Sequence, residues 1–335
     1  MRVIEKVERT FWEEISKSCP YATFFHTPHW AELMSKTFAY RDVTKGFIFE
    51  DGARVVFPLM KRKRSLLQGG LSDYISGPPY TYGGPITDKD LSSHQLNEIL
   101  EYIISAFKCY NSILIRGNPF GLPMLPTGFN EVKDLSYIIE LYKYNNERDL
   151  LKSYSERIST DINKAKKSNI VIKKASAVQD YEDLYALYKK ASAHWIHDLT
   201  NYPLALFQNV CRLKNINIDF WTAYHNNKMI GGDIVLTCNK ISNWWLSYYD
   251  REYSKYFARR YVLHQILMEC RDKGITFYDL GVGSGLKGIE FYKKSMGGEE
   301  FPHSAWIREN TFLKSLRNFK RIIVAASKRI HRDVH

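Results

Sequence analysis

The sequence reads Tyr278-Asp279-Leu280-Gly281-Val282-Gly283-Ser284-Gly285 at the end of an apolar run, and Glu290-Phe291-Tyr292-Lys293-Lys294 follows shortly after it. We expect a strand over Ile275 to Leu280, because the run is short, apolar and bounded by glycine. The glycines that follow let a ligand approach the backbone closely. The segment from Glu290 to Met296 predicts a short helix that ends at Gly297-Gly298, since glycine commonly ends a helix. The stretch therefore predicts a strand, a ligand-binding loop and a helix.

Other kinds of glycine-rich loop fit this position poorly. A methyltransferase carries such a loop after the first strand of its sheet, so several strand-helix units must still follow it. Only 50 of the 335 residues follow Gly285, which is too few for them. A dinucleotide site would need an acidic residue at the end of a second strand about 20 residues later, and none is found there. The chain has no phosphate loop of the P-loop type, and Gly283 stands where a nucleophile elbow would carry its serine. The sequence therefore disfavours all four kinds of site.

Both halves of the chain follow one order of predicted elements. In the first half we expect helices over 7–17, 28–37 and 90–107, and strands over 43–50, 53–60, 112–116 and 131–139. In the second half we expect helices over 178–194, 203–213 and 257–273, and strands over 218–224, 229–238, 242–249 and 275–280. Asp51-Gly52 and Asn226-Asn227 separate adjacent strands, as expected of hairpin turns. The shared order predicts a duplication.

The repeated order is the one expected of an N-acyltransferase domain of the GNAT type, whose mixed sheet splays open to admit an acyl donor. We therefore predict an α/β fold, built on α+β mixed sheets, with tandem GNAT-like acyltransferase domains over residues 1–145 and 146–310. The segment 311–335 carries apolar residues at helical spacing among lysines and arginines, which predicts an amphipathic helix. We expect this helix to pack back on the first domain, or else to lie on an anionic membrane.

Composition narrows the class of protein and its partners. The formal net charge of +12 predicts an anionic partner. The five cysteines lie far apart and form no Cys-x-x-Cys pair, which argues against a disulfide framework and a zinc site and predicts free thiols (Cys19, Cys109, Cys211, Cys238 and Cys270). No apolar run approaches the roughly 20 residues that span a bilayer. We therefore expect a cytoplasmic protein, with peripheral membrane contact as an added option.

Three segments of the second half, Trp244–Asp250, Lys273–Gly281 and Phe291–Gly297, together resemble the FemABX family of peptidoglycan bridge-forming aminoacyltransferases. CelD-type acyltransferases are similar in the aspartate-glycine strand end and in the aromatic-lysine pair. In the first half, Phe24 to Trp30 resembles the family's opening helix and Gly77 to Pro85 its first-domain loop.

The resemblance implies an enzyme whose acceptor lies in a cleft of the first domain and whose donor lies near the second. It implies that Lys293 holds or neutralises the reacting complex and that Lys36 meets phosphates of the acceptor. Asp279 is a candidate to orient or deprotonate an amine, or else it caps the turn that follows it. The other candidate substrate-binding residues are Tyr248, Tyr249, Tyr292, Gly281, Gly283 and Lys164, the last of which lies in a basic segment over 147–174.

We therefore expect an aminoacyltransferase that moves an amino acid from aminoacyl-tRNA to an amine on a cell-wall or envelope precursor. The alternative is acyl-CoA-dependent N-acyl transfer to a nucleotide- or lipid-linked amino sugar, which the absence of glycine from Ser254 to Arg260 disfavours. A binding protein of the same fold without catalysis is a third interpretation. We expect no tightly bound cofactor and no metal. The expected partners are an anionic small-molecule or lipid-linked acceptor, tRNA, and a membrane surface touched by the C-terminal helix, while the oligomeric state stays open.

Overall fold

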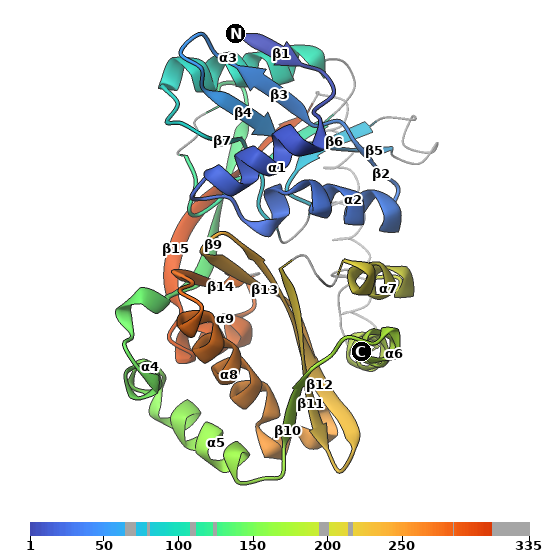
Figure 1. The fold of residues 1–335 in the computed structure, drawn as a ribbon, viewed down its shortest axis with the longest axis vertical. Helices are drawn as coiled ribbons and strands as arrows, with labels where there is room; N and C mark the ends of the chain where they lie inside the picture. The colour runs from blue at the N-terminus through green and yellow to red at the C-terminus, as the bar shows by residue number, and fades with distance from the viewer. Residues whose placement is uncertain are drawn as a thin grey trace, which may run out of the picture.

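Two sheets form the framework of the molecule (Figure 1). The computed structural model describes residues 1–63, 72–78, 81–107, 112–122, 126–193, 201–213, 217–283 and 285–309. In these residues an 11-stranded mixed sheet has the order β10-β11-β12-β13-β14-β9-β15-β8-β6-β5-β2, and a 4-stranded antiparallel sheet has the order β1-β3-β4-β7. The predicted C-terminal helix over 311–335 lies outside the described residues.

The first half confirms the predicted helices and hairpin. Thr27 begins the second helix by accepting a hydrogen bond from the Trp30 backbone N–H, and Pro28 occupies the first helical position, where its missing N–H costs nothing. Gly52 has φ of +80° in the turn between β3 and β4, which glycine adopts without strain. The elements are β1 (Arg2–Ile4), α1 (Arg9–Ser18), η1 (Phe24–His26), α2 (Pro28–Thr37), β2 (Tyr40–Asp42), β3 (Lys45–Ile48), β4 (Arg54–Phe57), β5 (Met60–Lys63), β6 (Ser72–Ser76), β7 (Ile86–Thr87), α3 (Ser93–Ala106), β8 (Ser112–Arg116) and β9 (Asn130–Glu140).

The second half likewise contains every helix and strand predicted for it. Asn226 and Asn227 both have positive φ, 49° and 62°, in the hairpin between β11 and β12, as a primed turn requires. The elements are η3 (Leu141–Lys143), α4 (Glu147–Ser153), α5 (Glu156–Lys166), β10 (Val171–Lys174), α6 (Val178–Ser192), α7 (Leu204–Arg212), β11 (Ile218–His225), β12 (Lys228–Cys238), β13 (Ile241–Tyr249), η4 (Arg251–Tyr256), α8 (Ala258–Asp272), β14 (Phe277–Val282), α9 (Lys287–Ser295) and β15 (Glu299–Glu309).

Each half gives one long strand to the other. β9 comes from the first half but pairs antiparallel with β14, and β15 comes from the end of the second half but pairs antiparallel with β8. The two exchanged strands also pair with each other over nine positions, from Glu299 opposite Ile138 to Ile307 opposite Asn130. Figure 1 shows that both strands span the lower and upper parts of the molecule, and they run in opposite directions. This exchange joins the halves into one continuous sheet, and the sequence did not predict it.

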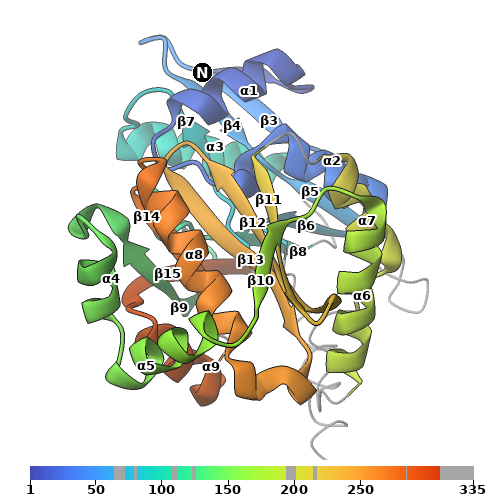
Figure 2. The same cartoon turned by 60° about the horizontal axis from the view of Figure 1, so that its bottom comes forward.

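Alternate residues of the second-half strands pack on opposite faces of the sheet, because successive side chains of a strand point in opposite directions. In β11, Ile218 and Phe220 join the cluster that includes residues of α6 and α7, whereas Trp221 and Ala223 join the cluster that includes residues of α8. Helices α5 and α8 therefore cover one face of these strands, and α6 and α7 cover the other (Figure 2).

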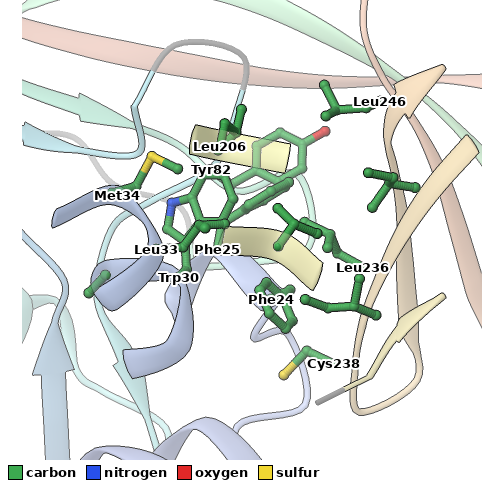
Figure 3. Close-up of a cluster of buried hydrophobic side chains, with 14 of the residues drawn as sticks. Phe24, Phe25, Trp30, Leu33, Met34, Tyr82, Leu206, Leu236, Cys238 and Leu246 are labelled. Carbon is green, nitrogen blue, oxygen red and sulfur yellow. The ribbon is translucent and has the colours of Figure 1, made fainter. Parts of the chain in front are cut away.

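A buried hydrophobic cluster also holds the halves together (Figure 3). Trp30 of α2 meets Trp245 of β13 edge to face, with ring centroids 5.2 Å apart. Burial of each large side chain here contributes about 1.5–3 kcal/mol. The cluster includes Phe24, Phe25, Leu33, Met34 and Tyr82 from the first half and Leu206, Leu236, Cys238 and Leu246 from the second.

The predicted free thiols are confirmed where the structure describes them. Cys19, Cys211, Cys238 and Cys270 are all buried thiols outside any disulfide, while Cys109 lies outside the described residues. Among the helices of the described ranges, none combines the length and the apolar character that crossing a membrane requires.

Gly231 of β12 leaves space for the ring of Tyr249, which lines a cavity. Gly231 lies opposite Tyr249 in the β12–β13 pair, and a Cβ at Gly231 would lie 2.0 Å from Tyr249 Cδ1. We expect Gly231→Ala to displace the Tyr249 ring and to lower the free energy of unfolding by about 1–3 kcal/mol, the usual cost of overpacking. Urea unfolding followed by tryptophan fluorescence measures this change.

Gly288→Ala is the matched control for that experiment. Apart from its chain neighbours and the backbone of its own helix, no described residue has an atom within 4 Å of a Cβ built at Gly288. Alanine is favoured over glycine inside a helix by up to about 1 kcal/mol. Equal or higher stability of Gly231→Ala relative to the unchanged protein would contradict the predicted crowding.

Candidate functional site

The parallel strands β13 and β14 part after three paired positions. Ile241–Asn243 pairs with Phe277–Asp279. Beyond Asn243, β13 continues beside β12, whereas β14 stays beside β9 and its register shifts between Asp279 and Val282. Gly281 lies at this shift with φ of +82°, a conformation that favours glycine. The edge of β13 is thereby separated from β14, and the sheet opens between them.

A cavity of about 1200 Å³ occupies this opening. Its walls include the second part of β13 (Trp244–Tyr249), the end of β14 (Leu280–Val282), parts of η4 and α9, and the first residues of α8. Phe25 of the first half also lines it. The volume exceeds the usual range for small-ligand pockets, about 300–1,000 Å³, so the cavity has room for a large ligand.

The Asp279 carboxylate lies where the strands part. It is 2% exposed and accepts hydrogen bonds from Asn243 Nδ2 at 2.9 Å and from the Gly281 backbone N–H at 2.7 Å. Burial raises the pKa of Asp279, while these hydrogen bonds, the Tyr82 hydroxyl and the Lys293 charge oppose the rise. The carboxylate thus has several partners in an apolar surrounding.

Lys293 reaches the same point from α9. Its side chain is buried, and its Nζ donates a hydrogen bond to the Val282 carbonyl oxygen at 2.7 Å. Burial lowers the pKa of Lys293 to about 8, with a smaller contribution from the Arg259 charge, whereas the Asp279 charge opposes the change. An amine with such a pKa can donate a proton and take it back near neutral pH.

Arg259 packs over two adjacent aromatic rings of the cavity wall, Trp244 and Tyr292. Its guanidinium carbon lies 4.9 Å from the Trp244 ring centroid and 5.2 Å from that of Tyr292. Behind the wall, the fully buried Asp233 carboxylate accepts hydrogen bonds from Trp244 Nε1 at 2.8 Å and from the Tyr249 hydroxyl at 2.5 Å. Asp233 therefore orients two rings of the wall, one of which packs on Arg259.

The cavity wall also includes the N-terminus of α8. Phe257 precedes this 15-residue helix with φ of +55°, and no described side chain caps its first N–H groups. Arg259 and Arg260 occupy the first turn, and Arg260 is paired with Asp161. Lys164 Nζ lies 5.7 Å from the Phe257 ring centroid. Free N–H groups, the helix dipole and these cations together favour an anion at this end of the cavity.

Most of the predicted site residues come together, and three do not line the cavity. Its lining includes Asp279, Lys293, Tyr248, Tyr249, Tyr292 and Gly281. Gly283 is packed beside it, where a Cβ would lie 2.9 Å from Glu290 Oε1. Lys164 packs over the Phe257 ring. Lys36 lies on the exposed part of α2, where its Nζ is 2.6 Å from Glu32 Oε1. The predicted contact of Lys36 with acceptor phosphates stays a prediction.

Sequence reasoning missed Asn243, Asp233 and Arg259. Asn243 and Asp233 could not have been found, because their roles depend on strand register and on which ring each side chain reaches. Arg259 left a usable signal, since Arg259-Arg260 opens a predicted helix at the end where acidic residues are normally preferred.

The sequence comparisons support a GNAT domain in the second half. Residues 152–294 match the family model for an acetyltransferase (GNAT) domain. This range contains β13, β14, α8 and most of α9, and therefore the principal walls of the cavity. A search of curated proteins found no match by sequence.

Solved structures with the same fold cover nearly the whole chain. FemX has a TM-score of 0.72 at 13% identity, over 94% of this chain and 99% of FemX. L-PGS from Bacillus licheniformis has a TM-score of 0.56 at 8% identity, over 99% of both chains. A tandem GNAT protein from the clavulanic acid biosynthesis pathway has a TM-score of 0.52 at 8% identity, over 92% of this chain and 98% of that one. The predicted FemX-like, tandem GNAT fold is confirmed.

The lowered pKa of Lys293 can be measured by competitive labelling with an amine-directed anhydride. Only the neutral amine reacts, so labelling of Lys293 should reach half its maximal rate near pH 8. The neighbouring Lys294 is the matched control, because its pairing with Glu300 raises its pKa above the usual value. Asp279→Asn should lower the Lys293 midpoint further, since it removes the opposing negative charge. Identical midpoints for the two lysines would contradict the predicted environment.

Proposed function

We propose that this protein transfers an acyl group from an activated donor to an amine, and that the donor is an aminoacyl-tRNA. The observation that carries the proposal is the cavity between β13 and β14, in which a buried lysine and a buried carboxylate lie near a cationic helix N-terminus. Each part suits one need of acyl transfer: a proton acceptor for the amine, a cation for the developing oxyanion, and an anchor for donor phosphates.

In the proposed reaction the Asp279 carboxylate accepts a proton from the ammonium group of the acceptor, and the neutral amine attacks the acyl carbon. The Lys293 ammonium stabilises the oxyanion that forms. An amide bond forms and the bond between the acyl carbon and the ribose oxygen breaks. The acceptor nitrogen loses two protons in all: one reaches the leaving oxygen through Lys293, and the other reaches solvent from Asp279.

The region before α8 favours an aminoacyl ester over a coenzyme A thioester. The turn η4 and the first residues of α8 contain no glycine, and the bulky Phe257 stands at the N-cap. A backbone cradle for a diphosphate is normally glycine-rich, because bound phosphates approach the main chain closely. The formal charge of +12 also suits a polyanionic donor such as tRNA.

Acyl-CoA remains the second candidate because the N-terminus of α8 has no side-chain cap in the described residues and lies on the cavity wall. A diphosphate could bind its N–H groups directly. In that case the protein would be an N-acyltransferase acting on an amino sugar.

The acceptor in this proposal is an amine on an anionic cell-wall or envelope precursor, either nucleotide- or lipid-linked. Phe25 lines the cavity from the first half, which supports an approach of the acceptor from that side. Contact with a membrane through the segment 311–335 stays a prediction.

Substitution of Lys293 tests the chemistry. We expect Lys293→Ala to lower kcat by about 100-fold or more, because a charged oxyanion partner is removed. Lys294→Ala is the matched control, since Lys294 is exposed and pairs with Glu300 at 2.6 Å. Transfer is measured as radiolabelled amino acid incorporated into an amine acceptor, with unfolding curves to verify the fold. Unchanged turnover in Lys293→Ala would remove Lys293 from the mechanism.

Substitution of Arg259 tests the donor site. We expect Arg259→Gln to weaken donor binding about tenfold or more, because charge-assisted hydrogen bonds contribute about 1.5–3 kcal/mol. Arg271→Gln, at the opposite end of α8 and bonded to Asp272, should leave donor affinity unchanged. Equal donor affinity in both variants would contradict phosphate binding at the start of α8.

A binding screen separates the two donors. The purified protein is titrated with aminoacyl-tRNA and with acyl-CoA, and each complex is then supplied with an amine acceptor. We expect saturable binding of aminoacyl-tRNA. Tight CoA binding without tRNA binding would make acyl-CoA the donor, and neither binding nor transfer with either donor would overturn the proposed function.

A further inference from the structure

Three half-buried aromatic rings cluster beside the outer end of the cavity. The Tyr256 ring of η4 packs on the His225 ring at the end of β11, with ring centroids 4.2 Å apart and an angle of 31° between the ring planes. The Tyr253 ring, three residues earlier in η4, lies 6.0 Å from His225 and 6.2 Å from Tyr256. Two segments far apart in the sequence thus build one partly exposed aromatic cluster.

Two exposed lysines lie over rings of this cluster. Lys228 Nζ, at the start of β12, is 5.0 Å from the Tyr253 ring centroid, and Lys255 Nζ of η4 is 5.2 Å from that of Tyr256. Among the described residues, neither lysine forms a salt bridge with a carboxylate. We call the five side chains, His225, Tyr253, Tyr256, Lys228 and Lys255, the aromatic-cationic patch.

The patch extends the cavity outward. Tyr253 and Lys255 belong to the cavity lining, whereas His225 and Tyr256 lie next to it but outside the lining. A ligand that leaves the cavity along η4 therefore meets the patch directly.

Strand β13 gives the separation between the patch and the buried carboxylate. Asn243 pairs beside Asp279 at one end of the cavity, and Tyr249, at the other end, stands two residues before η4. A strand rises about 3.3 Å per residue, so the segment from Asn243 to Tyr249 spans roughly 20 Å. The turn between β11 and β12 lies at the end of the second half away from the first half (Figure 1). The patch is thus far from the reacting atoms and from the side on which the acceptor approaches.

Aromatic rings beside cations are a common means by which proteins bind unpaired nucleobases. Every base has a flat π-face that stacks on a ring, and neighbouring lysines bind the phosphates that link nucleotides. Lys228 and Lys255 have long flexible side chains, so each can move from a ring to a phosphate when a base stacks. The patch therefore combines the two kinds of contact that a single nucleic-acid strand needs.

We propose that the aromatic-cationic patch is a subsite for an unpaired nucleotide of the donor, in which a base stacks on Tyr253 and Tyr256 and the lysines contact adjacent phosphates. The inference rests on the proposed function, in which an aminoacyl-tRNA enters this cavity. The esterified nucleotide stays beside the acyl carbon, so an earlier nucleotide of the unpaired 3′ strand reaches the patch. Coenzyme A also carries a base on a phosphorylated ribose, and the experiments below distinguish the two sources.

The first test measures binding without any transfer. A fluorescein-labelled RNA hairpin that ends in single-stranded CCA is titrated with the protein and followed by anisotropy, and coenzyme A is titrated by calorimetry. Tyr256→Leu removes a stacking ring and should weaken RNA binding about tenfold, within the range expected for one stacked base. Tyr256→Phe keeps the ring and should bind as tightly as the unchanged protein.

The neighbouring pair of Tyr224 and Lys173 supplies matched controls. Lys173 Nζ lies 5.1 Å from the Tyr224 ring centroid, an arrangement like that in the patch. Tyr224, however, packs against the cluster on the face of the sheet that α6 and α7 cover, whereas Tyr253 packs against the cluster on the α8 face. Tyr224→Leu and Lys173→Gln should therefore leave both affinities unchanged.

Salt dependence reports the phosphate contacts. Each neutralised phosphate of a single strand contributes about 0.7 to the slope of log K against log salt concentration. Lys228→Gln and Lys255→Gln should each reduce the slope of RNA binding by about this amount, and Lys173→Gln should not. Both patch lysines are exposed, so this test stays valid even where Tyr256→Leu fails to fold.

Steady-state kinetics separate a binding role from a catalytic one. Because the patch lies far from the reacting atoms, Tyr256→Leu should raise KM for the donor about tenfold and change kcat by no more than about twofold. A large fall in kcat with KM unchanged, in a variant whose unfolding curve is normal, would overturn the subsite.

The two titrations also identify the source of the bound base. Weaker RNA binding by Tyr256→Leu places the unpaired strand of tRNA on the patch, and weaker coenzyme A binding alone places the nucleotide of coenzyme A there. Equal affinities of Tyr256→Leu and Tyr224→Leu for both ligands, together with unchanged salt slopes in the lysine variants, would overturn the inference.

A failure of this inference is distinguishable from a failure of the proposed function. If the unchanged protein binds RNA through the patch but transfers no acyl group, the proposed function fails and the subsite stands. If the unchanged protein transfers an acyl group and the patch variants bind and react as it does, the subsite fails and the proposed function stands.

Discussion

The hydrogen bonds of the Asp279 carboxylate are the interaction on which the rest of the site depends. Asn243 and Asp279 are the last paired residues of two parallel strands, and their side chains bond to each other. The second carboxylate oxygen accepts from the Gly281 N–H, where β14 turns away. The Asp279 side chain therefore stabilises both the last paired position of the two strands and the bend of β14 that follows it. The cavity exists because the strands separate at this point and not earlier or later.

The properties of Lys293 follow from the same arrangement. Its ammonium group is buried, and burial alone would disfavour its charge. The Asp279 carboxylate and the Val282 carbonyl oxygen offset part of that cost. The result is a lysine that stays largely protonated at neutral pH and yet gives up its proton readily. The surface residue Lys294, next to it in the same helix, also stays protonated at neutral pH, but its raised pKa means that it gives up its proton less readily.

The exchange of β9 and β15 places residues of both halves beside the strand that carries Asp279. β9 brings Ser136 beside β14, and β15 brings His303 beside β9. The first-half loop that carries Tyr82 meets these strands because β15 also pairs with β8. Two domains with separate sheets would leave β14 without these neighbours.

Local features of the chain were predictable because they depend on residues close in sequence. The hairpin at Asp51-Gly52, the helix begun by Thr27 and the strand, loop and helix around Gly281 all follow from turn and capping preferences. The grouping of Asp279 with Lys293 and the three tyrosines was reached through a family resemblance. Strand β15 was missed because its eleven residues carry charges and a proline and resemble a loop until β8 and β9 flank them.

The sequence by itself determined many of the helices and strands and their repeated order, and its resemblance to a known family indicated the candidate pair of Asp279 and Lys293. Only the tertiary structure decided that β13 and β14 part at Asn243, that Arg259 packs over the adjacent rings of Trp244 and Tyr292, and that Asp279 bonds to Asn243. The physical reason is that helix and turn formation is governed by neighbours along the chain. Strand register, burial and contacts between distant side chains are governed by residues that meet only after the sheet has assembled.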